Sequence, residues 1–232
     1  MGALDGSSIV EVREGKPVSR EEFRKEVVAK IPAGYSPYFH LVFPSLIGLG
    51  SAATALAMLR EVNLYDVWFI PLVYMASNAV EWRAHKDILH RRTPPLQLLY
   101  DRHTPVHHRV FMTDDMAIRD TREFALVLIP PYGILLILAV VAPLGGLLWH
   151  FNLHNAACFF VATTMLYVVS YEWLHLAYHL PATHPIARLG LIQKLKRHHA
   201  THHDPRLMQQ WNFNVTVPLW DWVRGTIWRD RG

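Results

Sequence analysis

The chain has 232 residues, of which 51% are hydrophobic and 18% are charged, and its formal net charge is +4. This composition excludes a disordered chain, and the length suffices for one domain or two small ones. The single cysteine, Cys158, excludes both a disulfide within the chain and a metal site built from several thiolates. Fifteen histidines leave imidazole as the main metal-binding group.

Residues 1–38 are polar and charged, and we expect them to form a cytoplasmic N-terminal segment. Ser19 and Glu22 have the spacing of a capping box, which predicts an amphipathic helix beginning near Ser19. No apolar run follows Met1, so this segment does not read as a signal peptide. Residues 39–232 are expected to form one membrane-embedded domain.

Four apolar stretches are candidates for crossing a bilayer, which takes about 20 apolar residues per helix. They span residues 39–59, 67–80, 124–142 and 147–171. Pro143 and the glycines at 145 and 146 predict a break between the last two stretches. The expected fold is therefore an all-α integral membrane protein whose four transmembrane helices form two hairpins.

The positive charges are unevenly placed along the chain. Of the 23 Lys and Arg residues, only Arg60 lies outside residues 1–38, 81–123 and 172–232. With four spans these three segments share one side, and the positive-inside rule assigns that side to the cytoplasm. The sequence thus predicts a multi-pass protein with both termini in the cytoplasm, in a bacterial inner membrane or an ER-like membrane.

A histidine-rich segment follows each expected hairpin. Four spaced clusters result: His85 and His90; His103, His107 and His108; His175 and His179; His199, His202 and His203. A basic patch that binds lipid phosphates near the membrane does not explain these clusters, since histidine is mostly neutral at pH 7. We expect a helical, histidine-rich cap on the cytoplasmic side that binds two metal ions.

Residues four apart lie on one face of a helix. His175 and His179 are therefore expected to bind one ion, and so are His103 and His107 if their stretch is helical. Imidazole suits Fe, Zn, Cu and Ni, so the residue type alone leaves the metal open.

Adjacent histidines point about 100° apart on a helix, so one of each pair is expected to face one metal and its neighbour the second. His199 and His202 are three apart and fit one face. His85 and His90 are five apart, about 140° around an ideal helix. They require a helix end or local unwinding between them, or they face different metals.

Other polar residues near the clusters have several possible roles. We expect the flanking carboxylates to accept hydrogen bonds from histidine ring N–H groups, to cap helices or to face solvent. They are Glu81, Asp101, Glu172 and Asp204. Isolated histidines are expected to be ordinary core or surface residues at positions 40, 150 and 154, with His184 open. Alternating apolar residues from Trp211 to Leu219 predict an extended, strand-like segment covering the cap.

The chain closes with a segment from Asn212 to Thr226 that has Asn-Phe at its start and Trp-Asp and Gly-Thr at its end. Together with the ordered histidine clusters, this segment resembles the fatty acid hydroxylase/sterol desaturase superfamily over about residues 39–226. The second cluster departs from the commoner spacing, with three residues before its histidine pair. The resemblance implies as metal ligands His85, His90, His103, His107, His108, His175, His179, His199, His202 and His203, with His198 as an additional or alternative ligand.

The resemblance further implies a membrane-bound non-haem di-iron oxidoreductase. Such an enzyme uses O2 to hydroxylate or desaturate an unactivated C–H bond of a lipid or fatty acyl substrate, with no catalytic residue beyond the metal centre. Two iron ions are the implied cofactors, with zinc as a substitute in isolated protein. Because the chain lacks room for a fused electron-transfer domain, a separate cytochrome b5-like or ferredoxin-like protein is the expected electron donor. Nucleic acid is not an expected partner.

Two non-oxidative alternatives remain, a metal transporter and a haem-type electron carrier. A transporter needs ionisable residues inside its spans, and the middle of each expected span has neither His nor carboxylate. The axial ligands of a membrane cytochrome would lie within the facing spans, whereas these histidines cluster outside them. A structural zinc site takes four ligands, fewer than the ten available.

Overall fold

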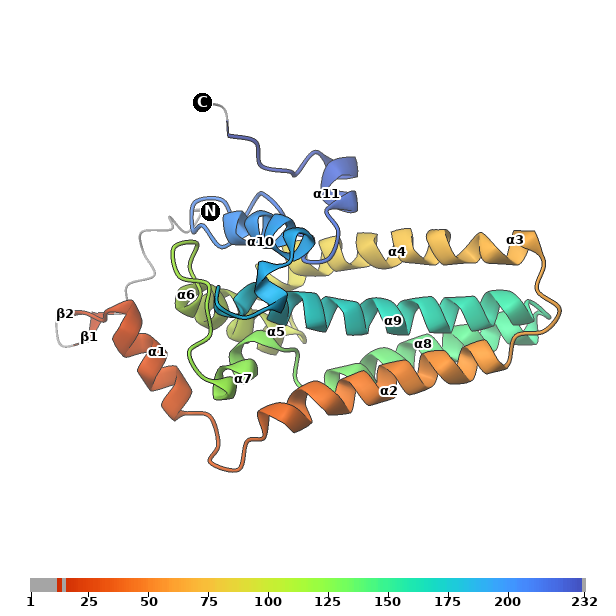
Figure 1. The fold of residues 1–232 in the computed structure, drawn as a ribbon, viewed down its shortest axis with the longest axis horizontal. Coiled ribbons are helices and arrows are strands. Elements are labelled where there is room, and N and C mark those ends of the chain that lie inside the picture. The colour runs from red at the N-terminus through yellow and green to blue at the C-terminus, as the bar shows by residue number, and fades with distance from the viewer. Residues whose placement is uncertain (1–11, 14–15, 231–232) are drawn as a thin grey trace.

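The computed structural model describes residues 12–13 and 16–230 of the chain. Four helices lie side by side along the length of the molecule (Figure 1). They are α2 (Pro37–Ala57), α4 (Phe69–Ala84), α8 (Gly133–His150) and α9 (His154–His179), with the short α3 (Leu64–Val67) leading into α4. Helix α9 packs against the other three, so it forms the centre of this bundle.

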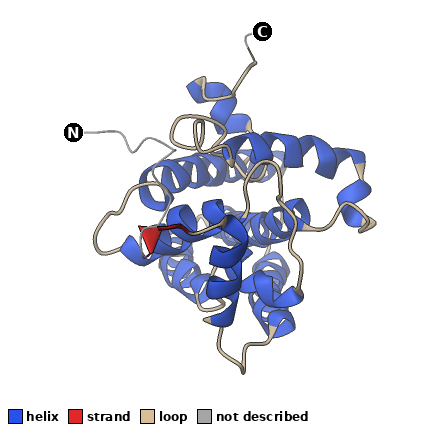
Figure 2. Ribbon diagram, turned by 90° about the vertical axis from the view of Figure 1, so that its left-hand side faces the viewer, coloured by secondary structure: helices blue, strands red, loops and turns tan. Residues whose placement is uncertain are grey.

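Short helices gather at one end of the bundle, and we call this region the cap (Figures 1 and 2). The cap consists of α1 (Arg20–Ala29), η1 (His85–Leu89), α5 (Gln97–Arg102), η2 (His103–His107), α6 (His108–Val110), η3 (Thr121–Glu123), α7 (Phe124–Val127), η4 (Ile186–Arg188), α10 (Gly190–His202) and α11 (Leu219–Arg224). An antiparallel pair, β1 (Val12–Arg13) and β2 (Lys16–Pro17), precedes α1. Apart from these two short strands, the described residues form only helices and loops, as expected.

Three helices, α2, α8 and α9, are long and apolar enough to cross a membrane. The expected second span, 67–80, begins at the end of α3 and otherwise lies in α4, which has 16 residues and does not meet that length. Helix α4 nevertheless runs alongside α9 over the same part of the molecule (Figure 1). The prediction of an apolar helical bundle is confirmed, and the fourth span stays a prediction.

The predicted bounds of the third and fourth spans were wrong. The third begins at Gly133 rather than Phe124, because the chain leaves helical geometry at Leu128 and Pro130–Pro131 cannot extend α7. Helix α8 then continues through Pro143, where a break was predicted. The actual turn lies at Asn152, which takes a left-handed backbone conformation (φ 61°) that asparagine tolerates.

Close helix approach explains why the glycine at 145 does not break α8. A Cβ atom added to Gly145 would lie 2.7 Å from Val161 Cγ2 of α9, so the two helices touch at this point. A Cβ at Gly48 of α2 would likewise overlap Val169 Cγ2 of α9. Small residues in membrane helices permit such contacts. These glycines therefore serve packing against α9 rather than chain reversal.

The N-terminal helix begins as predicted. Ser19 caps α1, and the capping box with Glu22 is complete. The buried Arg24 of α1 holds both carboxylate oxygens of Glu123 at 2.8 and 2.5 Å. This charge-assisted, bidentate contact fixes α1 against the cap.

Candidate metal centre

The ten histidines named from the sequence are all buried, and they form two groups at the junction of cap and bundle. Group one contains His85, His90, His103, His108 and His202. Group two contains His107, His175, His179, His199 and His203. Within each group one ligand atom from every residue lies within 4.8 Å of all the others. Ligands on opposite sides of one ion lie about 4 Å apart, so this spacing suits one ion per group.

A π-helix brings His85 and His90 together. The chain passes from α4 into η1, whose hydrogen bonds span five residues instead of four. Residues five apart therefore share a face, and the two rings stack with centroids 5.1 Å apart. The sequence left open a helix end, local unwinding or different metals for His85 and His90. The structure has local unwinding, in the π-helix η1.

A second π-helix changes the predicted pairing in the next cluster. In η2 the residue five after His103 is His108, and these two belong to group one. His107 belongs to group two, so the prediction that His103 and His107 share an ion, which assumed α-helical geometry, does not match the grouping. Pi-turns are frequent at functional sites.

In the remaining clusters, ordinary helical spacing holds. His175 and His179 fall in the same group, as predicted for residues four apart. On α10 the pair in one group is His199 and His203, again four apart, while His202 joins group one. The prediction that His199 pairs with His202 was therefore wrong. The prediction that adjacent histidines face different metals agrees with the grouping of His202 and His203.

Hydrogen bonds orient most of the rings. The Nδ1–H groups of His107, His179 and His202 donate to the backbone carbonyls of residues 126, 116 and 211 at 2.8, 2.7 and 2.8 Å. His85 donates in the same way to Phe213 O at 2.5 Å, and His203 donates to Phe111 O. His90 donates to the Thr104 hydroxyl, which itself donates to a carbonyl. Each of these neutral rings consequently directs an unprotonated Nε2 inward.

The inward nitrogens of these six rings lack the protons that would let them bond to one another. His90 Nε2 and His202 Nε2 lie 3.0 Å apart, although both rings carry their proton on Nδ1. Nε2 of His107, His175 and His179 is buried without a hydrogen-bond partner. Converging lone pairs are unfavourable unless a cation lies between them. The donor set therefore fits metal ions.

Burial keeps these rings neutral. Desolvation lowers the pKa of His107 and of His202 to about 4. It also lowers the pKa well below the usual value for His85, His90, His103, His108, His199 and His203, where neighbouring imidazoles add to the effect. The neutral imidazole is the form that coordinates a metal, so the rings need not lose a proton at pH 7.

Neither group contains a carboxylate among the described residues. Of the flanking acids, Asp101 and Asp204 pair with Arg92 and Arg206 at the surface. Glu81 is buried beneath residues 215 and 216 and accepts hydrogen bonds from their backbone N–H groups. None of these three carboxylates bonds directly to a histidine of either group in the described chain.

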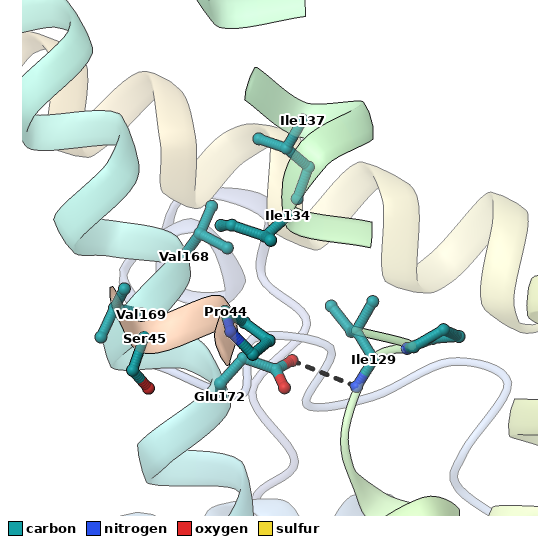
Figure 3. A pocket seen from close by; sticks show the side chains of 9 residues that line it. Pro44, Ser45, Ile129, Ile134, Ile137, Val168, Val169 and Glu172 are labelled. Carbon is teal, nitrogen blue, oxygen red and sulfur yellow. Dashed lines mark hydrogen bonds between the residues drawn. The ribbon is translucent and has the colours of Figure 1, made fainter. Parts of the chain in front are cut away.

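Glu172 lies one turn before His175 on α9, at the edge of a small apolar cavity (Figure 3). Its carboxylate is buried and accepts one hydrogen bond, from Ile129 N at 3.3 Å. Pro44 and Ser45 of α2 and Ile134 of α8 also line this cavity. An apolar space thus reaches the neighbourhood of group two from the bundle.

Residues 211–218, which we call the strap, cross over group one. The prediction of a covering segment was right, but the strap is irregular rather than a strand. Its carbonyls at 211 and 213 accept from His202 and His85. Sequence reasoning missed the residues that hold it: Asn78 contacts Val217 O and Trp220 N, and the buried Asp221 accepts from Phe213 N and Asn214 N. The Asn-Phe and Trp-Asp pairs of the closing segment were the available signal.

Other histidines lie outside both groups. His198 Nε2 donates to Asp221 Oδ2 at 3.1 Å, so His199 rather than His198 is the group member. His40 is buried between Tyr35 Oη and Ile129 O, away from the groups, as expected for a core residue.

Comparisons with known proteins agree with this arrangement. A family model described as fatty acid hydroxylase matches residues 70–226, which include all ten histidines. A solved structure titled "Full length scs7p (only hydroxylase domain visible)" has a similar fold, with a TM-score of 0.56 and 17% sequence identity. The match covers 97% of this chain and 84% of the other. A search of curated proteins gave no match.

Proposed function

Since the chain belongs to the fatty acid hydroxylase family, we propose that it hydroxylates an unactivated C–H bond of a lipid or fatty acyl chain, using O2 and two electrons. The observation that carries this proposal is the pair of buried, all-histidine groups whose unprotonated nitrogens converge. In the balanced reaction, R–H, O2, two electrons and two protons give R–OH and water. Membership of this family makes a hydroxylating oxygenase the expected class of enzyme.

We assign one iron ion to each group, with the ten histidines as ligands. Bound iron supplies the redox chemistry by which O2 is reduced and the C–H bond is oxidised. The residues of the chain hold the rings in one tautomer through the carbonyls at 111, 116, 126, 211 and 213. Burial of all ten rings excludes bulk water, which protects a reactive oxidant from side reactions.

The substrate chain would reach the groups from between α2, α8 and α9. A groove of about 610 Å³ lies between these helices farther from the cap and is lined mostly by apolar side chains. On α2, Pro44 of the small cavity and Ile47, Ser51 and Met58 of the groove follow one helix face. They extend over about 21 Å, more than half of a bilayer's hydrocarbon core. An extended acyl chain would lie along this apolar face of α2, with the groove holding most of its length.

We further propose four spans with the cap in the cytoplasm. Helices α3 and α4 together cover 64–84, about 31 Å at helical rise, which is the thickness of a bilayer core. Two electrons would come from a separate redox protein that binds the cap. A reporter fused after Gly232 should then be cytoplasmic, and one inserted near Asn63 should report the opposite side. Both reporters on one side would refute this topology.

The function is tested by comparing lipids from cells that express the wild-type chain or His175→Ala. A lipid species heavier by 16 Da is expected only with the wild type, because His175 belongs to group two. Purified protein supplied with Fe(II), reductant and O2 should form the same product. Equal lipid profiles in both cell lines, with both proteins present in the membrane, would refute the proposal. A loss of 2 Da would instead indicate desaturation.

A further inference from the structure

We propose that Asp221 is a positioning residue for group one, and that it acts on His85 through a single peptide unit of the strap. The inference rests on the proposed metal centre. Asp221 comes from α11, whereas His85 follows α4, so the connection exists only in the folded chain.

The peptide between Phe213 and Asn214 joins the two side chains. Its N–H, from Asn214, donates to Asp221 Oδ2 at 2.8 Å, and its C=O, from Phe213, accepts from His85 Nδ1 at 2.5 Å. Hydrogen bonds in series polarise one another, so a carboxylate on the N–H makes the carbonyl a stronger acceptor. A stronger acceptor on Nδ1–H holds the ring orientation and raises the basicity of Nε2 toward a metal.

The surroundings of Asp221 favour its ionised form. The side chain is fully buried and accepts hydrogen bonds from Phe213 N, Asn214 N, His198 Nε2 and Thr226 Oγ1. Burial by itself would raise the pKa of this carboxyl, but the hydrogen bonds from His198, Thr226 and Asn214 outweigh it and leave the pKa below the usual value. In the described part of the chain no Lys or Arg forms an ion pair with it. Besides the His198 ring, a cation held by group one would supply positive charge near this carboxylate.

This arrangement distinguishes His85 from the other rings that donate to carbonyls. The peptide whose carbonyl accepts from His202 donates its N–H, from Asn212, to a neutral backbone carbonyl, Thr226 O, at 2.8 Å. The corresponding N–H groups behind Phe111, Met116 and Leu126 make no hydrogen bond to a carboxylate within the described residues. The carboxylate therefore acts on group one and not on group two.

The strap has other supports, so the charge can be removed without freeing it. Glu81 accepts from the N–H groups of Val215 and Thr216, and Asn78 donates to Val217 O at 2.9 Å. Asp221→Asn keeps the volume and one oxygen acceptor while it removes the negative charge. Asp204→Asn is the matched control, because Asp204 adjoins His203 in sequence but pairs only with Arg206 and backbone at the surface.

The test measures metal retained per chain in the purified, full-length protein during titration with a chelator. Wild type should release two metals, and Asp221→Asn should release one of them at a 10- to 100-fold lower chelator concentration, about the effect of losing a ligand's hydrogen-bond partner. Asp204→Asn should match the wild type. The thermal midpoint of the metal-free protein should be similar in all three.

The outcomes separate the two proposals. Two metals in wild type and an unchanged titration for Asp221→Asn would overturn the relay alone, as would equal weakening of both metals. A wild-type chain that binds no metal would overturn the metal centre and the relay with it. If Asp221→Asn fails to fold, Asp221→Glu and Asp221→Gln replace it, since they share a length and differ in charge. The relay then requires tighter retention of the first metal in Asp221→Glu, and equal retention overturns it.

Discussion

Adjacent histidines on α10 allow the two groups to be perturbed separately. His202 belongs to group one and His203 to group two, and the groups share no residue. His202→Ala should weaken one metal and leave the other intact, and His203→Ala should do the reverse. Besides a lost coordinate bond, each change strands a buried carbonyl, Trp211 O or Phe111 O, at a cost of about 1–3 kcal/mol. This cost falls on the folded chain with or without metal and lowers the folding equilibrium constant roughly 5- to 150-fold, so the loss of metal affinity comes from the missing coordinate bond.

The assay is metal content after dialysis against a chelator, measured together with lipid hydroxylation. Each variant should retain about one metal per chain instead of two, and turnover should be abolished in both, because the proposed reaction uses the complete centre. His40→Ala is the control, since His40 is equally buried but lies outside both groups. It should retain both metals. Full metal content and normal turnover in His202→Ala would refute the ligand assignment.

Three further outcomes test the path, the packing and the metal. Ile137→Trp should fill the small cavity and slow turnover with metal content unchanged. Leu136→Trp changes an exposed side chain and should have little effect. Equal turnover in the two variants would contradict the proposed substrate path between the helices. Gly48→Ala should destabilise the protein by about 1–3 kcal/mol in thermal unfolding, because the new methyl group meets the stiff side chain of Val169, whereas Gly50→Ala meets no atom within 4 Å and should be tolerated. Removing metal with a chelator should lower the unfolding midpoint, since ions that bind only the folded chain stabilise it; an unchanged midpoint would argue against tight binding.

Local sequence patterns determined several parts of this protein. The capping box at Ser19 and Glu22 is complete because it depends on four consecutive residues. The apolar stretches form the bundle because burial of long apolar segments is set by composition. The ten buried histidines were also identifiable, since a set of ordered, spaced clusters has few other physical explanations.

Packing against α9 decided the helix bounds. Periodicity and turn residues predicted a break at Pro143, yet α8 continues through it and packs closely against Val161 of α9 at Gly145. Intrinsic helix propensity differs by a few kcal/mol at most, so tertiary contacts override it.

Only the tertiary structure decided which histidines share a group. The sequence cannot distinguish an α-turn from a π-turn at 85–89 or 103–107, and one extra residue per turn moves a ring from one histidine group to the other. The carbonyls that orient His85 and His202 lie in the strap, 128 and 9 residues away along the chain. Residue type supplies the donor atoms, but the direction of their lone pairs depends on contacts between segments that meet only when the chain folds.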